Sequence, residues 1–166
     1  GLPVINTLND LLLSGDRVIR IEAVLSGTLN FIFSSFKSGS VFSSIVREAK
    51  EKGYTEPDPR DDLNGMDVAR KVLILAREAG IDLELSSINV SGLVPKDCQE
   101  APSVDAFFDA LVRHDQEFET TRNLSESRGE KLRFMAILDE GKATVSMVSV
   151  NKDHPFYSLQ GTDNVI

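Results

Sequence analysis

The segment Gly53–Lys71 constrains the fold more than any other part of the chain, because it forces a turn and then starts a helix. Pro57 and Pro59 push the residues before them out of the helical region, so 56–62 is predicted to be an extended loop. Gly65 marks the end of this loop, and beyond it apolar residues recur at helical spacing. The segment also holds five carboxylates, which predicts a dense acidic loop at the start of a helix.

The rest of the chain alternates between strand-like and helical patterns. Apolar residues recur at every second position in Arg17–Leu25 and so share one face, which predicts a half-buried strand. One or two strands are predicted within 83–94, and 132–147 is predicted to be a hairpin with a longer turn. Strands that are first separated by helices and then form a hairpin indicate the α+β class, a mixed sheet covered by helices. Helices are predicted over 6–13, 29–36, 42–49, 67–79, 104–111 and 115–127, with Ser40 and Ser103 as caps.

Length and composition indicate one soluble domain over residues 1–166. The net charge of -8 and the scattered basic residues argue against binding to nucleic acid or to an anionic membrane surface. No apolar run approaches the roughly 20 residues of a membrane helix. A single cysteine, Cys98, excludes an internal disulfide and fits a reducing compartment, so we expect the cytoplasm, or a plastid if the source is a plant. The abrupt apolar start at Gly1 and the strand-like end at Ile166 predict a piece of a longer chain.

The acidic loop is the first candidate site, since a free amino acid needs carboxylates for its ammonium group. Glu56 and Asp62 are the candidates for that role. The alternative is that acidic residues ahead of a helix favour its positive end or cap its first N–H groups. We favour capping for Asp61 and Asn64, whereas Glu56 lies too far from the helix start to cap it.

Asp67 and Lys71 lie four residues apart and therefore share one helix face. Taken alone, such a pair is an exposed ion pair worth ~0.3–0.5 kcal/mol. Directly after an acidic loop, Lys71 instead keeps its proton and can donate it to a developing alkoxide, with Arg70 as its solvated neighbour.

Other motifs carry weaker signals. The turn Ser26-Gly27-Thr28 offers backbone N–H groups to a carboxylate, although without the neighbouring acidic loop ordinary capping by Ser26 or Thr28 would be the favoured interpretation. His114 and His154 have no Cys or His at metal-ligand spacing, so no metal site is expected. Cys98 is a poor candidate nucleophile because its acidic neighbours Asp97 and Glu100 would raise its pKa. No Gly-x-Gly-x-x-Gly motif occurs, so this chain brings no dinucleotide-binding domain.

These motifs resemble the homoserine dehydrogenase family. The likeness is strongest in Gly53–Lys71, and it extends over nearly the whole chain. The other similar stretches are Gly1–Ile5, Leu25–Phe33, Asp153–Phe156 and Gly161–Asn164. The last two of these are most similar to the branch of the family in which an aspartokinase precedes the dehydrogenase.

The resemblance implies a reaction, the reversible reduction of L-aspartate 4-semialdehyde to L-homoserine with NAD(P)H, on the route to threonine and methionine. It implies that 1–166 is the substrate-binding and dimerisation domain of a homodimer, and that this domain is incomplete and inactive alone. It also implies that NADP or NAD is bound mainly by an absent domain, so that this chain alone binds no cofactor. In the family the lysine of Asp-Val-Ala-Arg-Lys moves the proton, which is Lys71. Glu56 and Asp67 are then the residues that hold the substrate. Asp62, Thr55, Tyr54, Gly27 and Thr28 would line the same pocket.

Two other readings stay open. A non-catalytic module could sense an amino acid by gripping its ammonium group with the acidic loop. The chain could also act only as a dimerisation scaffold, in which case changes at Glu56 and Lys71 would have no effect.

Overall fold

The computed structural model describes residues 3–166, so Gly1 and Leu2, the start of the first family-like stretch, lie outside it. A four-stranded mixed sheet with the order β1-β3-β4-β2 forms the centre. Strand β3 (Lys131–Asp139) pairs antiparallel with β4 (Lys142–Val150) along its whole length, and its last four residues pair antiparallel with β1 (Arg20–Ala23). The short β2 (Asn89–Val90) runs parallel to β4. The predicted α+β class with a mixed sheet is confirmed.

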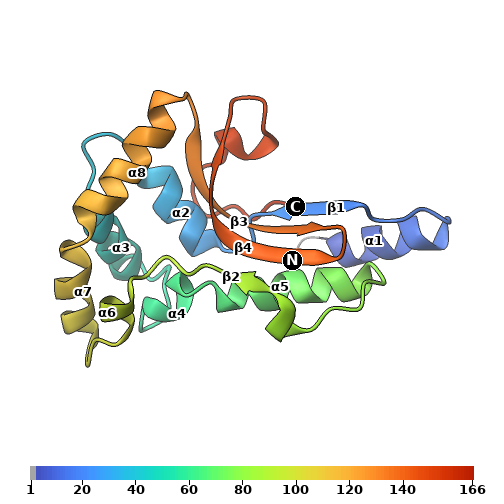
Figure 1. Cartoon of the computed structure of the whole chain (residues 1–166), viewed down its shortest axis with the longest axis horizontal. Helices are drawn as coiled ribbons and strands as arrows, with labels where there is room; N and C mark the ends of the chain where they lie inside the picture. The colour runs from blue at the N-terminus through green and yellow to red at the C-terminus, as the bar shows by residue number, and fades with distance from the viewer. Residues whose placement is uncertain (1–2) are drawn as a thin grey trace.

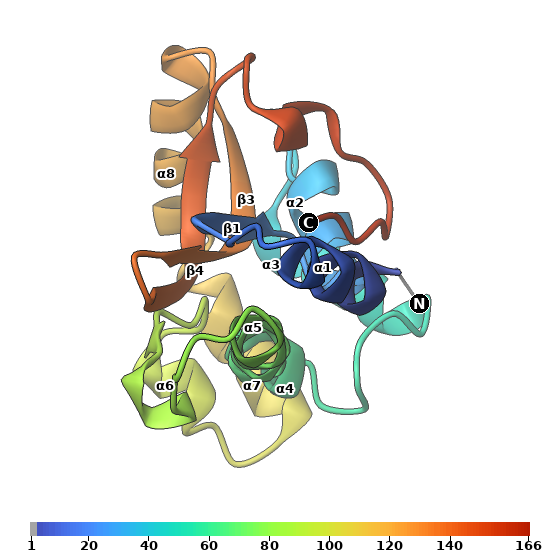
Figure 2. The same cartoon turned by 90° about the vertical axis from the view of Figure 1, so that its right-hand side faces the viewer.

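Helices cover one face of this sheet and one of its ends (Figures 1 and 2). Helix α5 (Met66–Glu78) runs beneath the covered face, with α1 (Val4–Leu13) beside it. At the other end, α2 (Gly27–Ser35) packs on β3 and on α3 (Phe42–Glu51). The remaining elements are α4 (Arg60–Leu63), α6 (Lys96–Gln99), α7 (Val104–Val112), α8 (Asp115–Ser127) and the 3-10 turns η1 (Leu85–Ser87) and η2 (Pro155–Ser158).

The core follows from the alternation of residues in β3. Leu132, Phe134, Ala136 and Leu138 point to the covered face and are buried in the main apolar cluster with residues of α2, α3, α5 and α7. The intervening Met135 is buried on the opposite face, in a smaller cluster. Both faces of β3 therefore carry buried side chains, but only the first is covered by helices.

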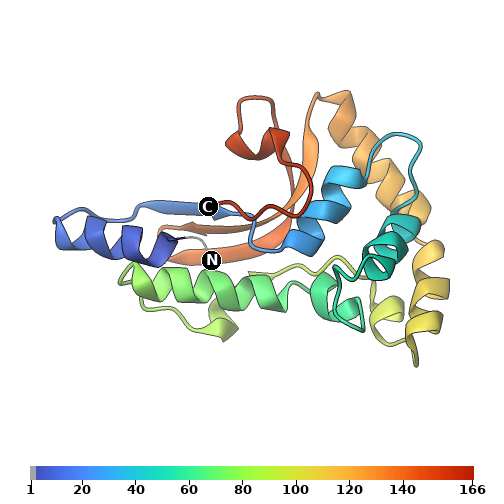
Figure 3. The same cartoon turned by 180° about the vertical axis from the view of Figure 1, so that it is seen from behind.

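The covering of the second face comes from residues 154–165, which we call the C-terminal strap (Figure 3). Arg133, on β3, is only 2% exposed and donates to the carbonyl oxygens of Phe156, Tyr157 and Leu159 at 2.8–3.1 Å. Further along, Val165 forms a two-bond bridge with Val24, directly after β1. The strap is thus held at both ends through its main chain.

Three predicted elements differ from the structure. Part of the stretch predicted as an extended loop, 56–62, forms helix α4, because Pro59 has a helical φ of -61° and Asp58 accepts the N–H of Arg60 at 3.0 Å. The predicted strand Arg17–Leu25 shortens to β1, and Ile19 is 72% exposed. The stretch 83–94 contributes only η1 and the two residues of β2.

Two local details also differ. The hairpin turn is short, since Asp139 pairs with Lys142 and both Glu140 and Gly141 have positive φ, as a two-residue I′ turn requires. Ser40 does not cap α3, which begins after Val41. One N–H group in the first turn of α3 is instead bound by Asp115 of α8, whose carboxylate accepts both the backbone N–H and the hydroxyl of Ser43 at 2.8 and 2.6 Å.

Candidate functional site

A polar hollow of about 470 Å³ lies where the N-terminal ends of α2 and α5 meet the acidic loop. The sequence predicted that acidic groups and Lys71 would share one cavity, and the geometry agrees. Four carboxylates and two cations surround it. The lining residues are Ser26, Glu56, Asp61, Asp62, Asp67, Val68, Arg70 and Lys71.

Lys71 is held at the wall of this hollow by two contacts. Its Nζ donates to the carbonyl oxygen of Leu25 at 2.9 Å and lies 2.7 Å from Oδ2 of Asp67, one turn earlier in α5. The side chain of Lys71 is 45% exposed, and that of Asp67 is 55% exposed. An ammonium group has three N–H donors, so these two contacts orient the amine and leave a donor for a bound molecule.

The acidic loop is closed by a bond between its two ends. Oδ2 of Asp62, in α4, accepts the backbone N–H of Glu56 at 2.8 Å. Burial raises the pKa of Asp62 above its usual value, although the bond from Glu56 opposes that shift. The carboxylate of Asp62 is therefore committed to the loop, whereas Glu56 is exposed at the hollow and remains available to a ligand.

Asn64 and Asp61 were both expected to cap a helix, but only Asn64 does so. Oδ1 of Asn64 accepts the N–H of Met66, the first residue of α5, at 2.8 Å, so the predicted capping role is confirmed. For Asp61 it is wrong, because within residues 3–166 its carboxylate serves no helix N–H group and it lines the hollow instead.

The turn Ser26-Gly27-Thr28 mainly caps the N-terminus of α2 and contributes little to the wall of the hollow. Oγ of Ser26 accepts the N–H of Leu29 at 3.2 Å, and only Ser26 of this turn lines the hollow. Gly27 is pressed against the strap, since a Cβ at this position would lie 2.7 Å from the carbonyl oxygen of Thr162. Thr28 is buried and donates its hydroxyl to the carbonyl oxygen of Tyr54.

Tyr54 and Thr55, which we expected to line the pocket, support its loop from outside the lining. The ring of Tyr54 meets that of Phe31 edge-on, with centroids 5.0 Å apart. Thr55 donates its hydroxyl to the carbonyl oxygen of Glu56 at 2.8 Å. Together with Thr28, these residues fix the backbone that presents Glu56.

The sequence did not predict an apolar groove on the other side of Lys71 from the acidic hollow. A shallow apolar groove of about 190 Å³ adjoins the acidic hollow, and Lys71 lines both. The groove is formed by α1, α5 and the chain end: Val4, Ile5, Leu25, Ile74, Leu75 and Ile166. Exposed Ile74 in an otherwise amphipathic helix was a signal for it, whereas the carbonyl of Leu25 that holds Lys71 left no signal, because every residue has a carbonyl.

The remaining candidate nucleophile is unsuited to that role. Cys98 is buried, and burial together with the charge of Asp97 raises its pKa to about 11. A protonated, buried thiol is a poor nucleophile, as the sequence predicted.

Within the described part of the chain, none of the helices is both long and apolar enough to cross a membrane.

Comparisons with known proteins decide the family. The model of the family described as homoserine dehydrogenase matches residues 3–166. This chain belongs to that family. Homoserine dehydrogenases are oxidoreductases, and the resemblance drawn from Gly53–Lys71 is thereby confirmed.

Similar proteins extend beyond this chain in length. It is 49% identical to the chloroplastic bifunctional aspartokinase/homoserine dehydrogenase 1 of Arabidopsis thaliana and covers 18% of that protein. It is 45% identical to the homoserine dehydrogenase of Schizosaccharomyces pombe and covers 46% of it. A crystal structure of a Candida auris protein of unknown function matches with a TM-score of 0.93 and 43% identity, over 99% of this chain and 48% of that one. The chain thus spans about half or less of these relatives.

Proposed function

We propose that this chain forms the substrate-binding half of a homoserine dehydrogenase, which interconverts L-aspartate 4-semialdehyde and L-homoserine with NAD(P)H in threonine and methionine biosynthesis. One observation carries the proposal: the amine of Lys71 is held between Leu25 and Asp67 at a hollow that also contains Glu56 and Asp61. Such a hollow offers carboxylates to an amino acid's ammonium group and a protonated amine to its reacting oxygen.

The proton step follows from the position of Lys71. As the aldehyde carbon is reduced, negative charge develops on its oxygen, and Lys71 donates a proton to that oxygen. In the reverse direction the same amine accepts the proton of the homoserine hydroxyl. Asp67 keeps Lys71 oriented, while exposed Glu56 is placed to hold the substrate ammonium.

The nicotinamide cofactor fits the second side of Lys71. The groove beside it is apolar, and a flat, largely apolar ring packs against such a surface. Leu25, Ile74 and Leu75 would contact the ring, and no glycine-rich phosphate loop is present in this chain. A nicotinamide bound there would supply the hydride. We therefore propose that NADP or NAD is bound mainly by another domain of the whole enzyme, and that residues 1–166 alone are inactive.

A homodimer belongs to the same proposal. On the outer face of the sheet Ile137 is a half-buried apolar side chain outside both apolar clusters, and Val148 lies at the edge of the smaller cluster. Light scattering on the purified chain measures this directly: a mass of two copies is expected, and a monomer at every concentration would contradict it.

Substitution of Lys71 in the complete enzyme tests the catalytic assignment. Lys71→Ala is expected to lower kcat by ~10²–10⁴-fold, the usual contribution of a positioned acid or base. Lys152→Ala, an exposed lysine outside the hollow, serves as the matched control and should retain wild-type turnover. Near-normal kcat for Lys71→Ala would remove this residue from the mechanism.

Asp67→Ala tests the role of this carboxylate in holding the substrate. Loss of this carboxylate should raise KM for homoserine, because Lys71 and the substrate ammonium both lose a partner. An unchanged KM with normal turnover would contradict the assignment.

Calorimetry distinguishes the enzyme from an amino-acid sensor. A sensor should bind its amino acid tightly as the isolated 166-residue chain, since its site is complete. Half of an enzyme site should bind homoserine feebly. Tight binding without turnover in the complete protein would favour the sensor.

A further inference from the structure

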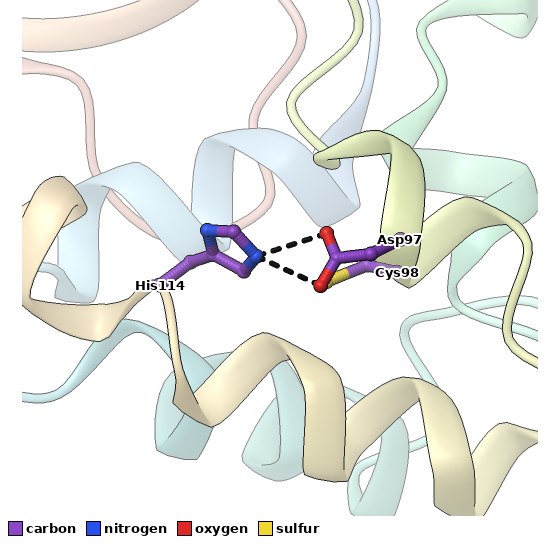
Figure 4. A group of neighbouring side chains, drawn as sticks. All are labelled: Asp97, Cys98 and His114. Atoms are coloured by element: carbon purple, nitrogen blue, oxygen red, sulfur yellow. Dashed lines mark hydrogen bonds and ion pairs between the residues drawn. The ribbon is translucent and has the colours of Figure 1, made fainter.

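Three side chains with metal-binding atoms meet where α6 approaches the junction of α7 and α8. Asp97 and Cys98 lie on α6, and His114 lies between α7 and α8, 17 residues after Asp97 (Figure 4). One oxygen, the sulfur and one ring nitrogen all lie within 4.8 Å of one another. We call these three residues the donor cluster.

We propose that the donor cluster binds a divalent transition-metal ion of the zinc type. Zinc in proteins is bound by thiolate, imidazole and carboxylate groups at roughly 2.0–2.3 Å, which places its ligand atoms roughly 3.4–3.8 Å apart. Nε2 of His114 already lies 3.0 Å from Oδ1 of Asp97. In the proposed site the sulfur of Cys98, which lies within 4.8 Å of both atoms, is the third protein ligand, and a water completes four-coordination. Spacing along the sequence gave no sign of this site, because His114 comes from a separate helix pair.

The second ring nitrogen of His114 has a carboxylate nearby. Nδ1, the ring nitrogen on the far side from Asp97, lies 3.5 Å from Oε2 of Glu117 in the first turn of α8. Metal-binding imidazoles usually donate this second N–H to a carboxylate, which fixes the ring orientation and leaves the other nitrogen for the metal. Glu117 is therefore the orienting partner in the proposed site.

The local charges balance a divalent ion. Asp97, Glu117 and a thiolate at Cys98 carry three negative charges, and Arg113 carries one positive charge. The net charge of -2 is neutralised by one divalent cation. Arg113 contacts Oδ2 of Asp97 at 3.2 Å, so it can remain in place while Oδ1 binds the metal.

Binding exchanges protons for the ion without any redox step. The S–H bond of Cys98 breaks, a sulfur–metal bond forms, and the proton passes to the solvent. Nε2 of His114 binds the ion without a proton, so a proton carried there passes to Nδ1 if the ring is neutral or to the solvent if it is an imidazolium; the bound imidazole then has its N–H on Nδ1, on the side of Glu117.

Titration of the 166-residue protein with Co²⁺, followed by Zn²⁺ competition, tests the site. One Co²⁺ per chain is expected, with a thiolate-to-cobalt charge-transfer absorption that Zn²⁺ removes. Cys98→Ser should abolish this absorption, and His114→Gln should weaken binding by at least ~10–100-fold. His154→Gln is the matched control, because its partner is Glu22, outside the donor cluster, and it should bind as wild type.

A gentler variant keeps the test decisive if Cys98→Ser or His114→Gln fails to fold. Glu117 is exposed, so Glu117→Gln should leave the fold intact. It should lower the affinity for Co²⁺ by ~10-fold while the thiolate-to-cobalt absorption persists. Absence of the thiolate absorption in the wild-type protein would overturn the proposal. So would wild-type affinity in Cys98→Ser or His114→Gln.

Discussion

Lys71 and Arg133 are two cations that both bind main-chain carbonyl groups, yet they have opposite roles. Lys71 is 45% exposed and divides its donors between one carbonyl and the exposed carboxylate of Asp67. Arg133 is 2% exposed and donates to the carbonyls of four residues, Leu132 on its own strand and three in the strap. Burial lowers the pKa of Arg133, but four carbonyl partners satisfy its guanidinium. Solvent access, more than the type of bond, separates a group that can exchange partners from a fixed anchor.

Removing Arg133 should produce the largest loss of stability. Arg133→Met leaves three strap carbonyls and one strand carbonyl without their donor in a buried place, so the free energy of unfolding should fall by about 3 kcal/mol or more. Urea unfolding measures this. Lys71→Met is the matched control and should change stability by no more than ~0.5 kcal/mol, since its ion pair is exposed. Equal losses in the two variants would erase the distinction between them.

Gly27→Ala tests how tightly the strap contacts the site, with a smaller effect. Alanine normally stabilises a helix relative to glycine by about 1 kcal/mol. Here the new Cβ would lie 2.7 Å from the carbonyl oxygen of Thr162, so a loss of ~1–3 kcal/mol is expected instead. Thermal or urea unfolding gives the sign, and Ser35→Ala at the other end of α2 serves as the control. A gain in stability would show that the strap yields easily.

The smallest effect concerns Asp62 and pH. Its pKa is raised in the folded state, mainly by burial, so ionisation is harder there than in the unfolded chain. Stability present below the unfolded pKa of about 3.9 should therefore decline as pH rises through the folded pKa. Asp62→Asn still accepts the N–H of Glu56 and should lack this decline. Urea unfolding at several pH values compares the two, and identical pH profiles would contradict the raised pKa.

Local sequence signals predicted the parts of the fold that depend on neighbouring residues. Helix α8 spans 115–127 as its pattern indicated, and the predicted cap Ser103 accepts the N–H of Ala106 at 3.1 Å. The acidic hollow could also be foreseen, because Glu56 to Lys71 form one short segment joined by two turns.

Features that depend on distant contacts could not be foreseen. Asp115 serves the start of α3 from 72 residues away, so the expected cap at Ser40 was unnecessary. The carbonyl of Leu25 holds Lys71 across 46 residues, and His114 reaches Asp97 only after α7 has turned back. None of these partners follows a periodicity, because their proximity results from packing of whole elements.

The way Arg133 holds the strap has a consequence for variation among related chains. Its guanidinium recognises only oxygens that every amino acid possesses, and Asn30 likewise binds the carbonyl of Gln160. Side chains at Ser158 and Gln160 can therefore drift freely over evolutionary time while the path of the backbone stays the same. Arg133 therefore fixes the backbone path of the strap, while the apolar side chains of Phe156, Tyr157, Leu159 and Val165 pack it onto the sheet.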